Sequence, residues 1–284
     1  MARLTAKDIM DMKRSGEKIS MITAYDYPTA YLCDKAGVEI ILVGDSVGPF
    51  VLGYRDTRRV TLDDIIRHAA AVSRAVERAH VVGDMPFGTY YRPDVAVENA
   101  IKMVREAGVD SVKLEGGREV AGIVREITGS GIDVMGHIGF TPQRSTDTSV
   151  YPVRGLDVDE AEDILNDAYA LVDAGVYAIV LEFVASQVAQ LIREVVDVPI
   201  IGIGSGPHCD GQVLVLHDVI GLRVGEHPPY AAKYGDVAGE ILSAVRKYVG
   251  EVKEGLFPHP SNYRSMDEPT YKEFINRVGR RKIV

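Results

Sequence analysis

Five short apolar segments of this chain each end in a polar residue, and this recurrence limits the available folds more than any other feature. The clearest is Ile40–Val43, which runs directly into Gly44, Asp45 and Ser46. The other four segments end at Asp84, Glu115, His137 and Glu182. A short apolar run of this kind is typical of a strand buried on both faces of a parallel sheet. We therefore expect parallel strands whose carboxyl ends share one site.

Segments with helical spacing alternate with these strands. Thr61 and the acidic residues after it open one predicted helix, which continues to about Ala79, because a hydroxyl N-cap and a negatively charged first turn favour a helix. With the apolar run Val213–Leu216 as the last strand, the pattern gives eight strands. The segment Gly204–Gln212 is too short for a full crossover helix, so we expect the last unit to be irregular.

Eight strands alternating with helices predict an α/β fold of the (β/α)8 barrel type, for which roughly 250 residues is typical. The chain has 284 residues, of which 46% are hydrophobic. An open doubly wound sheet has the same local pattern. We favour the closed barrel because polar residues follow so many of the strands.

The domain organisation follows from the same pattern. We expect one catalytic domain over residues 1–258, including an N-terminal helix over Thr5–Ser15 that covers one end of the barrel. Residues 259–284 change in character and end in a basic cluster, so we expect an extension that packs on the barrel or at an oligomer interface.

Composition narrows the functional classes. A formal net charge of -9 argues against a nucleic-acid surface, which needs clustered Lys and Arg. Cys33 and Cys209 lie far apart without paired metal spacing, so we expect reduced thiols. There is no signal-peptide core and no uncharged apolar run of about 18 residues. We therefore expect a soluble, cytoplasmic protein.

Convergent carboxylates predict a metal site. In a parallel barrel all carboxyl ends of strands lie on one face, and two carboxylates about 4 Å apart repel by roughly 4 kcal/mol at an effective dielectric of 20. A hard cation such as Mg²⁺ relieves this repulsion and commonly takes only one or two protein carboxylates. We assign Asp45 and Asp84 as its ligands. The structural alternative is that each carboxylate caps a helix.

The remaining strand-end residues have two interpretations each. Lys113 and Glu115 lie two positions apart, so both can point to the same side of their strand, either in the site or as a structural ion pair. His137 is either a substrate contact or a hydrogen-bonded core histidine. Glu182 has apolar neighbours that would raise its pKa towards the range of a useful base. The glycines at Gly202–Gly206 suggest either phosphate binding or a tight loop.

Several motifs together resemble the ketopantoate hydroxymethyltransferase family. The motifs are Thr23–Asp26, Leu42–Ser46, Lys113–Gly117, Gly136–Gly139, Thr141–Gln143 and Gly202–Gly204. They occur in family order between about Ser20 and Pro258. The resemblance implies a Mg²⁺-dependent (β/α)8 barrel of the phosphoenolpyruvate/pyruvate type. The loop Ser205–Cys209 departs from the family pattern.

The resemblance also implies a role for each matching residue. It gives Asp45 and Asp84 as direct metal ligands that also contact substrate, with Glu115 completing the metal site through water. Ser46 and Lys113 would hold the substrate's carboxylate and keto end. Glu182 would be the proton acceptor.

The implied reaction transfers a hydroxymethyl group from 5,10-methylenetetrahydrofolate, or a related methylene tetrahydropterin, to 3-methyl-2-oxobutanoate. The product would be 2-dehydropantoate, on the route to pantothenate and coenzyme A. The partners would be these two substrates, with Mg²⁺ as cofactor and neither nucleic acid nor membrane involved. The resemblance further implies a homo-oligomer, with a decamer as its size.

Two alternatives share the barrel and remain open at this point. One is another Mg²⁺-dependent 2-oxo-acid carbon–carbon lyase of the same superfamily, although the Lys-Lys-Cys-Gly-His loop of the isocitrate-lyase subgroup is absent. The other is a non-catalytic metabolite-binding barrel. In that case we would expect Glu182 or Asp84 to be substituted, and both are present.

Overall fold

The computed structural model describes residues 2–145 and 152–279. It divides the chain into two compact units, Met1–Gly235 and Asp236–Val284. The sequence predicted a boundary after Pro258, whereas the first unit ends at Gly235, before α9 (Val237–Lys253). No side chain of α9 is buried, which is why this helix separates from the first unit. The last part of the expected extension, residues 280–284, lies outside the described residues.

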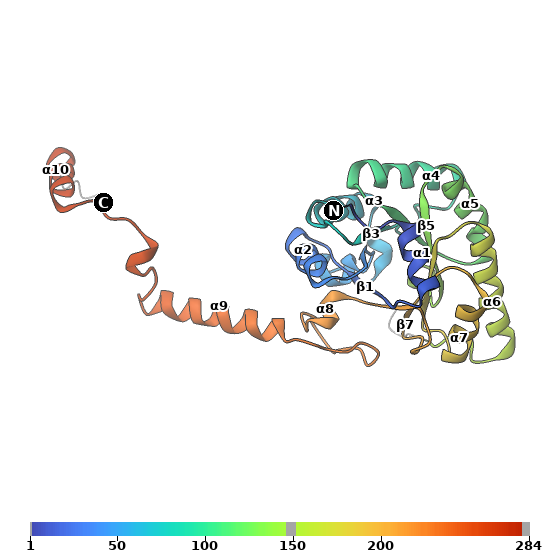
Figure 1. The fold of residues 1–284 in the computed structure, drawn as a ribbon. Coiled ribbons are helices and arrows are strands. Elements are labelled where there is room, and N and C mark those ends of the chain that lie inside the picture. Colours follow the sequence, from blue (N-terminus) through green and yellow to red (C-terminus); the bar gives the residue numbers. More distant parts are fainter. Residues whose placement is uncertain (1, 146–151, 280–284) are drawn as a thin grey trace. The chain divides into compact units, whose positions relative to one another are not determined.

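The first unit is a closed barrel of parallel strands arranged in chain order (Figure 1). The strands are β1 (Ile19–Thr23), β2 (Ile40–Val43), β3 (His80–Asp84), β4 (Ser111–Glu115), β5 (Asp133–Gly139), β6 (Ala178–Glu182), β7 (Ile200–Ile203) and β8 (Gly211–Leu214). The barrel closes where β1 pairs with β8, with Ile19 opposite Gly211. The predicted (β/α)8 barrel is confirmed, and the open sheet is excluded.

Helices follow most strands and form the outer layer of the barrel (Figure 1). The α-helices of this unit are α1 (Ala6–Ser15), α2 (Tyr27–Ala36), α3 (Leu62–Ala75), α4 (Pro93–Lys102), α5 (Ala121–Gly129), α6 (Val158–Asp173), α7 (Ser186–Val195) and α8 (Leu216–Val219). Short 3-10 or π-helical turns are η1 (Gly48–Leu52), η2 (Thr57–Arg59), η3 (Met103–Ala107), η4 (Arg118–Val120) and η5 (Pro142–Arg144).

The last barrel unit is irregular, as expected. Residues 204–210 are all described, and no helix separates β7 from β8 there. The predicted strand Val213–Leu216 is displaced, because pairing with β1 begins at Gly211 and Leu216 already opens α8. The predicted end of the helix that Thr61 caps is also too late, because the backbone turns extended at Val76.

The strand sequences are predominantly apolar because both faces of each strand are buried. In β2, Ile40 and Leu42 belong to the apolar cluster inside the barrel, whereas Ile41 and Val43 belong to the larger cluster between strands and helices. Alternate side chains of a strand point to opposite faces, so both faces need apolar residues. In β2 the polar residues therefore come only after the strand has ended.

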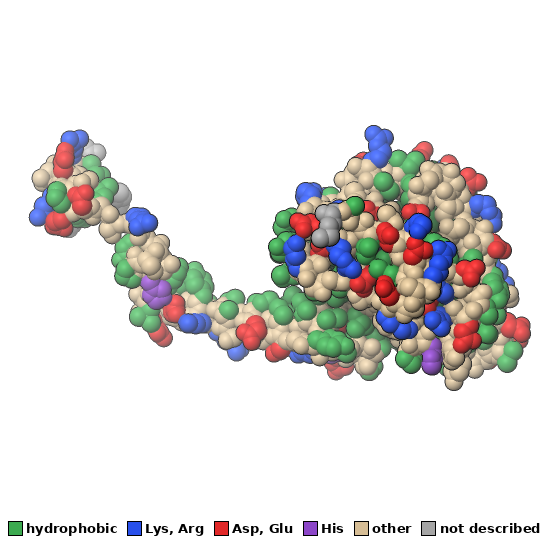
Figure 2. Space-filling view, in the orientation of Figure 1, with side chains coloured by type: hydrophobic (Ala, Val, Ile, Leu, Met, Phe, Trp, Pro, Cys, Tyr) green, Lys and Arg blue, Asp and Glu red, His purple; other side chains and the backbone are tan. Residues whose placement is uncertain are grey.

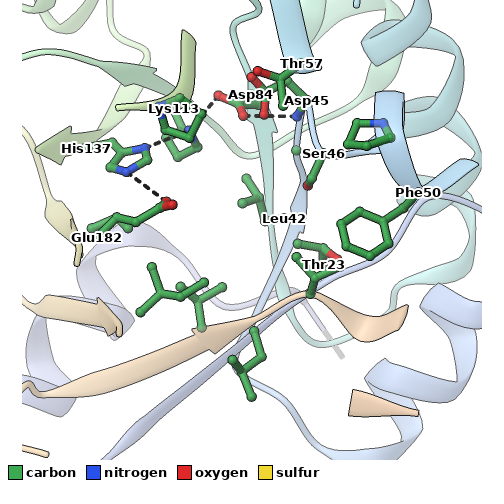
Figure 3. Close-up of a pocket in the computed structure, with 18 of the residues that line it drawn as sticks. Thr23, Leu42, Asp45, Ser46, Phe50, Thr57, Asp84, Lys113, His137 and Glu182 are labelled. Carbon is green, nitrogen blue, oxygen red and sulfur yellow. Dashed lines mark hydrogen bonds and ion pairs between the residues drawn. The ribbon is translucent and has the colours of Figure 1, made fainter. Parts of the chain in front are cut away.

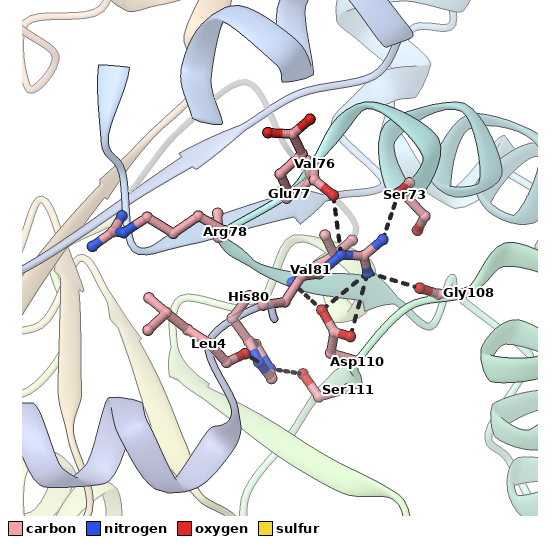
Figure 4. Close-up of polar contacts among 12 residues, drawn as sticks. Leu4, Ser73, Val76, Glu77, Arg78, His80, Val81, Gly108, Asp110 and Ser111 are labelled. Atoms are coloured by element: carbon pink, nitrogen blue, oxygen red, sulfur yellow. Dashed lines mark hydrogen bonds and ion pairs between the residues drawn. The ribbon is translucent and has the colours of Figure 1, made fainter. Parts of the chain in front are cut away.

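The N-terminal segment packs at the amino end of the barrel, and Figure 4 shows polar contacts in this region. Ile9 of α1 packs in the interior cluster. Arg3 Nη1 donates to the Gly108 carbonyl at 3.0 Å and lies 3.2 Å from Asp110 Oδ2. His80 contacts the Leu4 carbonyl through Nδ1 at 2.9 Å. These contacts join the N-terminal segment to this end of the barrel.

The second unit contains α9, η6 (Pro260–Asn262) and α10 (Glu268–Val278). Within it, Tyr248 packs edge-on against Phe257 with ring centroids 5.4 Å apart. Six large apolar residues of α9 are exposed along the helix (Figure 2); they are Ile241, Leu242, Val245, Tyr248, Val249 and Val252. In neither unit is any described helix long and apolar enough to cross a membrane.

Candidate active site

A cavity of about 440 Å³ opens at the carboxyl ends of the strands (Figure 3). It contains every residue that the sequence nominated for the site: Asp45, Ser46, Asp84, Lys113, Glu115, His137 and Glu182. They come from five consecutive strands or from the residues directly after them. The barrel therefore brings them together as predicted.

The two aspartates are neighbours because their strands are paired. Val43 lies opposite Gly83 in the parallel register of β2 and β3, so Asp45 and Asp84 emerge side by side. The backbone N–H of Asp45 donates to Asp84 Oδ2 at 3.1 Å. Both residues are buried, with 6% and 1% of their surface exposed.

Lys113 is the cationic centre of the cavity and is itself buried. Its Nζ lies 2.8 Å from Asp84 Oδ1, 4.0 Å from Glu115 Oε1 and 3.3 Å from His137 Nδ1. Burial alone would lower the pKa of Lys113, but Asp84, Glu115 and Asp45 outweigh it and raise the pKa. The lysine therefore stays charged.

The same burial acts on the carboxyl groups in the opposite sense. It raises the pKa of Asp84 to about 7, with the charge of Asp45 adding to it and Lys113 opposing it. Burial also raises the pKa of Glu115 well above its ordinary value, again against the charge of Lys113. One lysine is thus too little positive charge for these carboxylates, because desolvation and like charge both favour protonation.

Glu182 lies across the cavity, beside His137 (Figure 3). Burial raises the pKa of Glu182 to about 8 although Lys113 opposes the shift. His137 Nε2 lies 3.3 Å from Glu182 Oε2, without an aligned hydrogen bond. Burial and Lys113 lower the pKa of His137 well below its ordinary value, so this imidazole is neutral.

Ser46 faces the cavity from the turn after β2. Its Oγ lies 2.8 Å from the hydroxyl of Tyr25, which fixes its direction. A Cβ atom on Gly44 would lie 2.9 Å from Ser46 Oγ and 3.5 Å from the Leu42 side chain. A larger residue at position 44 would therefore displace the Ser46 hydroxyl.

The carboxylates fit a divalent cation held by two protein ligands. Asp84 Oδ1 is buried without an aligned hydrogen bond and lies 2.8 Å from Lys113 Nζ, and a carboxylate oxygen beside one cation still has a second lone pair for coordination. Mg²⁺ prefers oxygen donors and commonly takes one or two carboxylates plus water and substrate oxygens. Across residues 2–145 and 152–279, no group of three or more His, Cys, Asp or Glu residues converges on a metal position. Asp45 and Asp84 are accordingly the residues that could hold Mg²⁺ directly.

Two buried residues next to the site, Gln143 and Tyr90, were assigned no role from the sequence. Gln143 Nε2 donates to Asp45 Oδ2 at 2.9 Å, and its own Oε1 accepts from the Tyr90 hydroxyl at 2.7 Å. Neither residue ends a strand, so the strand-end pattern could not reveal them. The only sequence signal was that Gln143 lies in one of the family-like motifs.

The glycine run after β7 forms a tight loop. Gly204 and Gly206 have φ angles of 64° and 82°, a region that residues with a side chain rarely adopt. A Cβ atom on Gly206 would lie 2.4 Å from Ser186 Oγ. The glycines thus have a structural explanation, as the tight-loop alternative expected.

A closed (β/α)8 barrel with convergent polar residues in a cavity at the carboxyl ends of its strands defines a barrel enzyme. Solved structures with this fold include phosphonopyruvate hydrolase in complex with oxalate and Mg²⁺, at a TM-score of 0.61, 13% identity and 96% coverage of each chain. Another is 2,3-dimethylmalate lyase, a member of the PEP mutase/isocitrate lyase superfamily, at a TM-score of 0.58 and 17% identity, covering 97% of this chain and 94% of that one.

The family model for ketopantoate hydroxymethyltransferase matches residues 3–260. A 3-methyl-2-oxobutanoate hydroxymethyltransferase of Ignicoccus hospitalis is 52% identical over 264 residues, covering 93% of this chain and all of the relative. One from Pyrococcus furiosus is 50% identical, covering 98% of this chain and 96% of the relative. The chain belongs to the ketopantoate hydroxymethyltransferase family and is an enzyme. The non-catalytic alternative is thereby removed.

Proposed function

We propose that this enzyme transfers a hydroxymethyl group from a methylene tetrahydropterin, such as 5,10-methylenetetrahydrofolate, to 3-methyl-2-oxobutanoate. The product is 2-dehydropantoate, and the step belongs to pantothenate and coenzyme A biosynthesis in the cytoplasm. The observation that carries the proposal is the placement of Glu182, with a pKa of about 8, in one cavity with the paired carboxylates of Asp45 and Asp84. The named relatives support the same substrate.

In this proposal Asp45 and Asp84 hold Mg²⁺ directly, and Glu115 completes the site through water. Bound Mg²⁺ would supply Lewis-acid polarisation of the 2-oxo group, together with positive charge near the carboxylates. Ser46 binds the substrate's carboxylate, and Lys113 binds its keto oxygen. Lys113 is suited to this role because its ammonium group is buried and stays charged.

Glu182 is the proposed base. It accepts the proton from C3 of the 2-oxo acid, and Lys113 stabilises the negative charge that develops on the keto oxygen. Water adds to the one-carbon unit while both of its bonds to the pterin nitrogens break, so the unit is released as formaldehyde and the water protons go to the departing pterin. C3 then bonds to the formaldehyde carbon, and the alkoxide that forms takes the proton held by Glu182. Val180, Ile203 and Val213 line the cavity and keep this region apolar, which raises the basicity of Glu182.

Hydrogen exchange tests the proposal without the second substrate. With enzyme and Mg²⁺ in D₂O, 3-methyl-2-oxobutanoate should lose its C3 proton signal in NMR spectra even when no pterin is present. The controls are the same mixture with EDTA and the same mixture without protein. If the signal persists with enzyme and Mg²⁺, the proposed proton abstraction is wrong.

We also propose that the chain forms a homo-oligomer, with a decamer as the size that the family resemblance implies. The support is the exposed apolar stripe of α9, since an apolar helix face of this length is costly to leave in water. Light scattering coupled to size-exclusion chromatography measures the mass directly. A mass corresponding to one chain at micromolar concentration would contradict the proposal.

A further inference from the structure

Gln143 makes four hydrogen bonds directly behind the residues that line the cavity, and only 1% of its surface is exposed. Its Nε2 donates to Asp45 Oδ2 at 2.9 Å and to the Met85 carbonyl at 3.1 Å. Its Oε1 accepts from Tyr90 at 2.7 Å, and its backbone N–H donates to Glu115 Oε2 at 3.0 Å. This single residue therefore connects groups at the ends of β2, β3 and β4.

Tyr90 determines which way the Gln143 amide faces. A phenol can donate only one proton, and here that proton goes to Oε1 of Gln143. Burial raises the pKa of Tyr90 above its ordinary value, so the donor proton is retained. If the amide were reversed, Oε1 would face both the Asp45 carboxylate and the Met85 carbonyl, two acceptors without a proton between them.

The contact between Gln143 and Asp45 limits how that carboxylate can bind a cation. The amide occupies one lone pair of Asp45 Oδ2, so the other carboxylate oxygen is the better donor for coordination. Mg²⁺ demands near-ideal octahedral geometry, which favours a carboxylate fixed in one orientation with one coordinating oxygen. Groups that orient ligands in this way typically contribute about 10–100-fold in metal affinity.

We propose that Gln143, itself oriented by Tyr90, is a positioning residue that fixes Asp45 as a single-oxygen ligand for the divalent cation. The inference rests on the proposed function, because it takes Asp45 to be a metal ligand. A purely structural role is the competing explanation, in which Gln143 only satisfies buried polar groups. The two differ in whether cation affinity changes while the fold is intact.

Cation affinity of the full-length chain, without either substrate, separates the two explanations. Mn²⁺ serves as the probe, and electron paramagnetic resonance reports the free ion. Gln143→Met removes the amide but keeps the backbone bond to Glu115, so it isolates the contact with Asp45. Gln190→Met is the matched control, because Gln190 is exposed on α7 and its side-chain amide donates to Glu194, far from the proposed metal ligands in sequence.

The expected result is a dissociation constant for Mn²⁺ about 10–100-fold higher in Gln143→Met and unchanged in the Gln190→Met control. Tyr90→Phe should weaken binding in the same direction by a smaller factor, because the amide remains but can reverse. This second variant also tests the inference if Gln143→Met fails to fold. Melting temperatures measured with EDTA report the structural cost separately.

An affinity within about twofold of wild type in the folded variants would overturn the inference and leave the proposed function standing. Absence of Mn²⁺ binding by the wild-type chain would be a different failure. It would remove the proposed metal site itself, and the positioning role with it.

Discussion

Replacing Glu182 by glutamine tests the proposed base most sharply. The side chain keeps its size and its distance from His137, but it can no longer accept a proton. General-base catalysis typically contributes about 10²–10⁴-fold. Exchange of the C3 hydrogen of 3-methyl-2-oxobutanoate in D₂O should therefore slow by at least about 10²-fold in Glu182→Gln.

The pH dependence follows from the raised pKa of Glu182. A base works only when deprotonated, and with a pKa of about 8 only about a tenth of the Glu182 side chains are ionised at pH 7. The ionised fraction reaches about nine-tenths at pH 9. Wild-type exchange should therefore rise about tenfold between pH 7 and pH 9, and the residual exchange of the variant should lack this rise.

Proton NMR of the C3 signal measures both rates with Mg²⁺ present. Glu126→Gln is the matched control, because Glu126 is exposed on α5 and the substitution is the same. Binding of the 2-oxo acid, measured by calorimetry, should persist in Glu182→Gln because the metal ligands are untouched. Exchange at the wild-type rate in that variant would refute the assignment, and the base would have to be sought elsewhere in the cavity.

Three further predictions follow from the charged groups. Asp84→Asn should weaken Mn²⁺ binding by more than the 10–100-fold that is typical when a residue that only orients a ligand is replaced. Electron paramagnetic resonance measures the affinity, and an unchanged affinity would exclude Asp84 as a ligand. Lys113→Met should lower the free energy of unfolding by about 3–5 kcal/mol, because the buried carboxylates lose their cation. Urea unfolding with EDTA present measures this loss, and a loss below about 1 kcal/mol would contradict the prediction. Burial alone would raise the pKa of Asp34, but hydrogen bonds from the backbone N–H groups of residues 77–79 outweigh it and lower the pKa. Asp34→Asn should therefore lower the free energy of unfolding by about 2–4 kcal/mol at pH 7. The difference from wild type should shrink as the pH falls below about 4, because the wild-type carboxylate is then protonated. A difference that does not change with pH would contradict this explanation.

The barrel could be predicted from the sequence because its strands are buried on both faces. Ile40–Val43 had to be continuously apolar to fill the interior and the helix interface at once. The polar residues of the site lie at or near the carboxyl ends of the strands, which a parallel barrel gathers on one face. Asp84 and Glu182 were identified by this rule alone, and both line the cavity.

Other parts of the structure depend on contacts that the local pattern does not encode. The start of β8 is set by pairing with β1, so the apolar run from Val213 gave a displaced strand. The division after Gly235 was missed because α9 carries apolar residues like a barrel helix but buries none of them. Gln143 was assigned no role because its hydrogen-bond partners are distant in sequence, and Asp45 is the farthest of them.

The central claim is that this chain joins a hydroxymethyl group to C3 of 3-methyl-2-oxobutanoate with the help of a divalent cation. The most direct measurement is formation of 2-dehydropantoate, detected by mass spectrometry, from this 2-oxo acid and 5,10-methylenetetrahydrofolate. We expect product with Mg²⁺, its loss on treatment with EDTA, and its return when Mg²⁺ is restored. Failure to form product with this or any related methylene tetrahydropterin, or full activity in EDTA, would contradict the account.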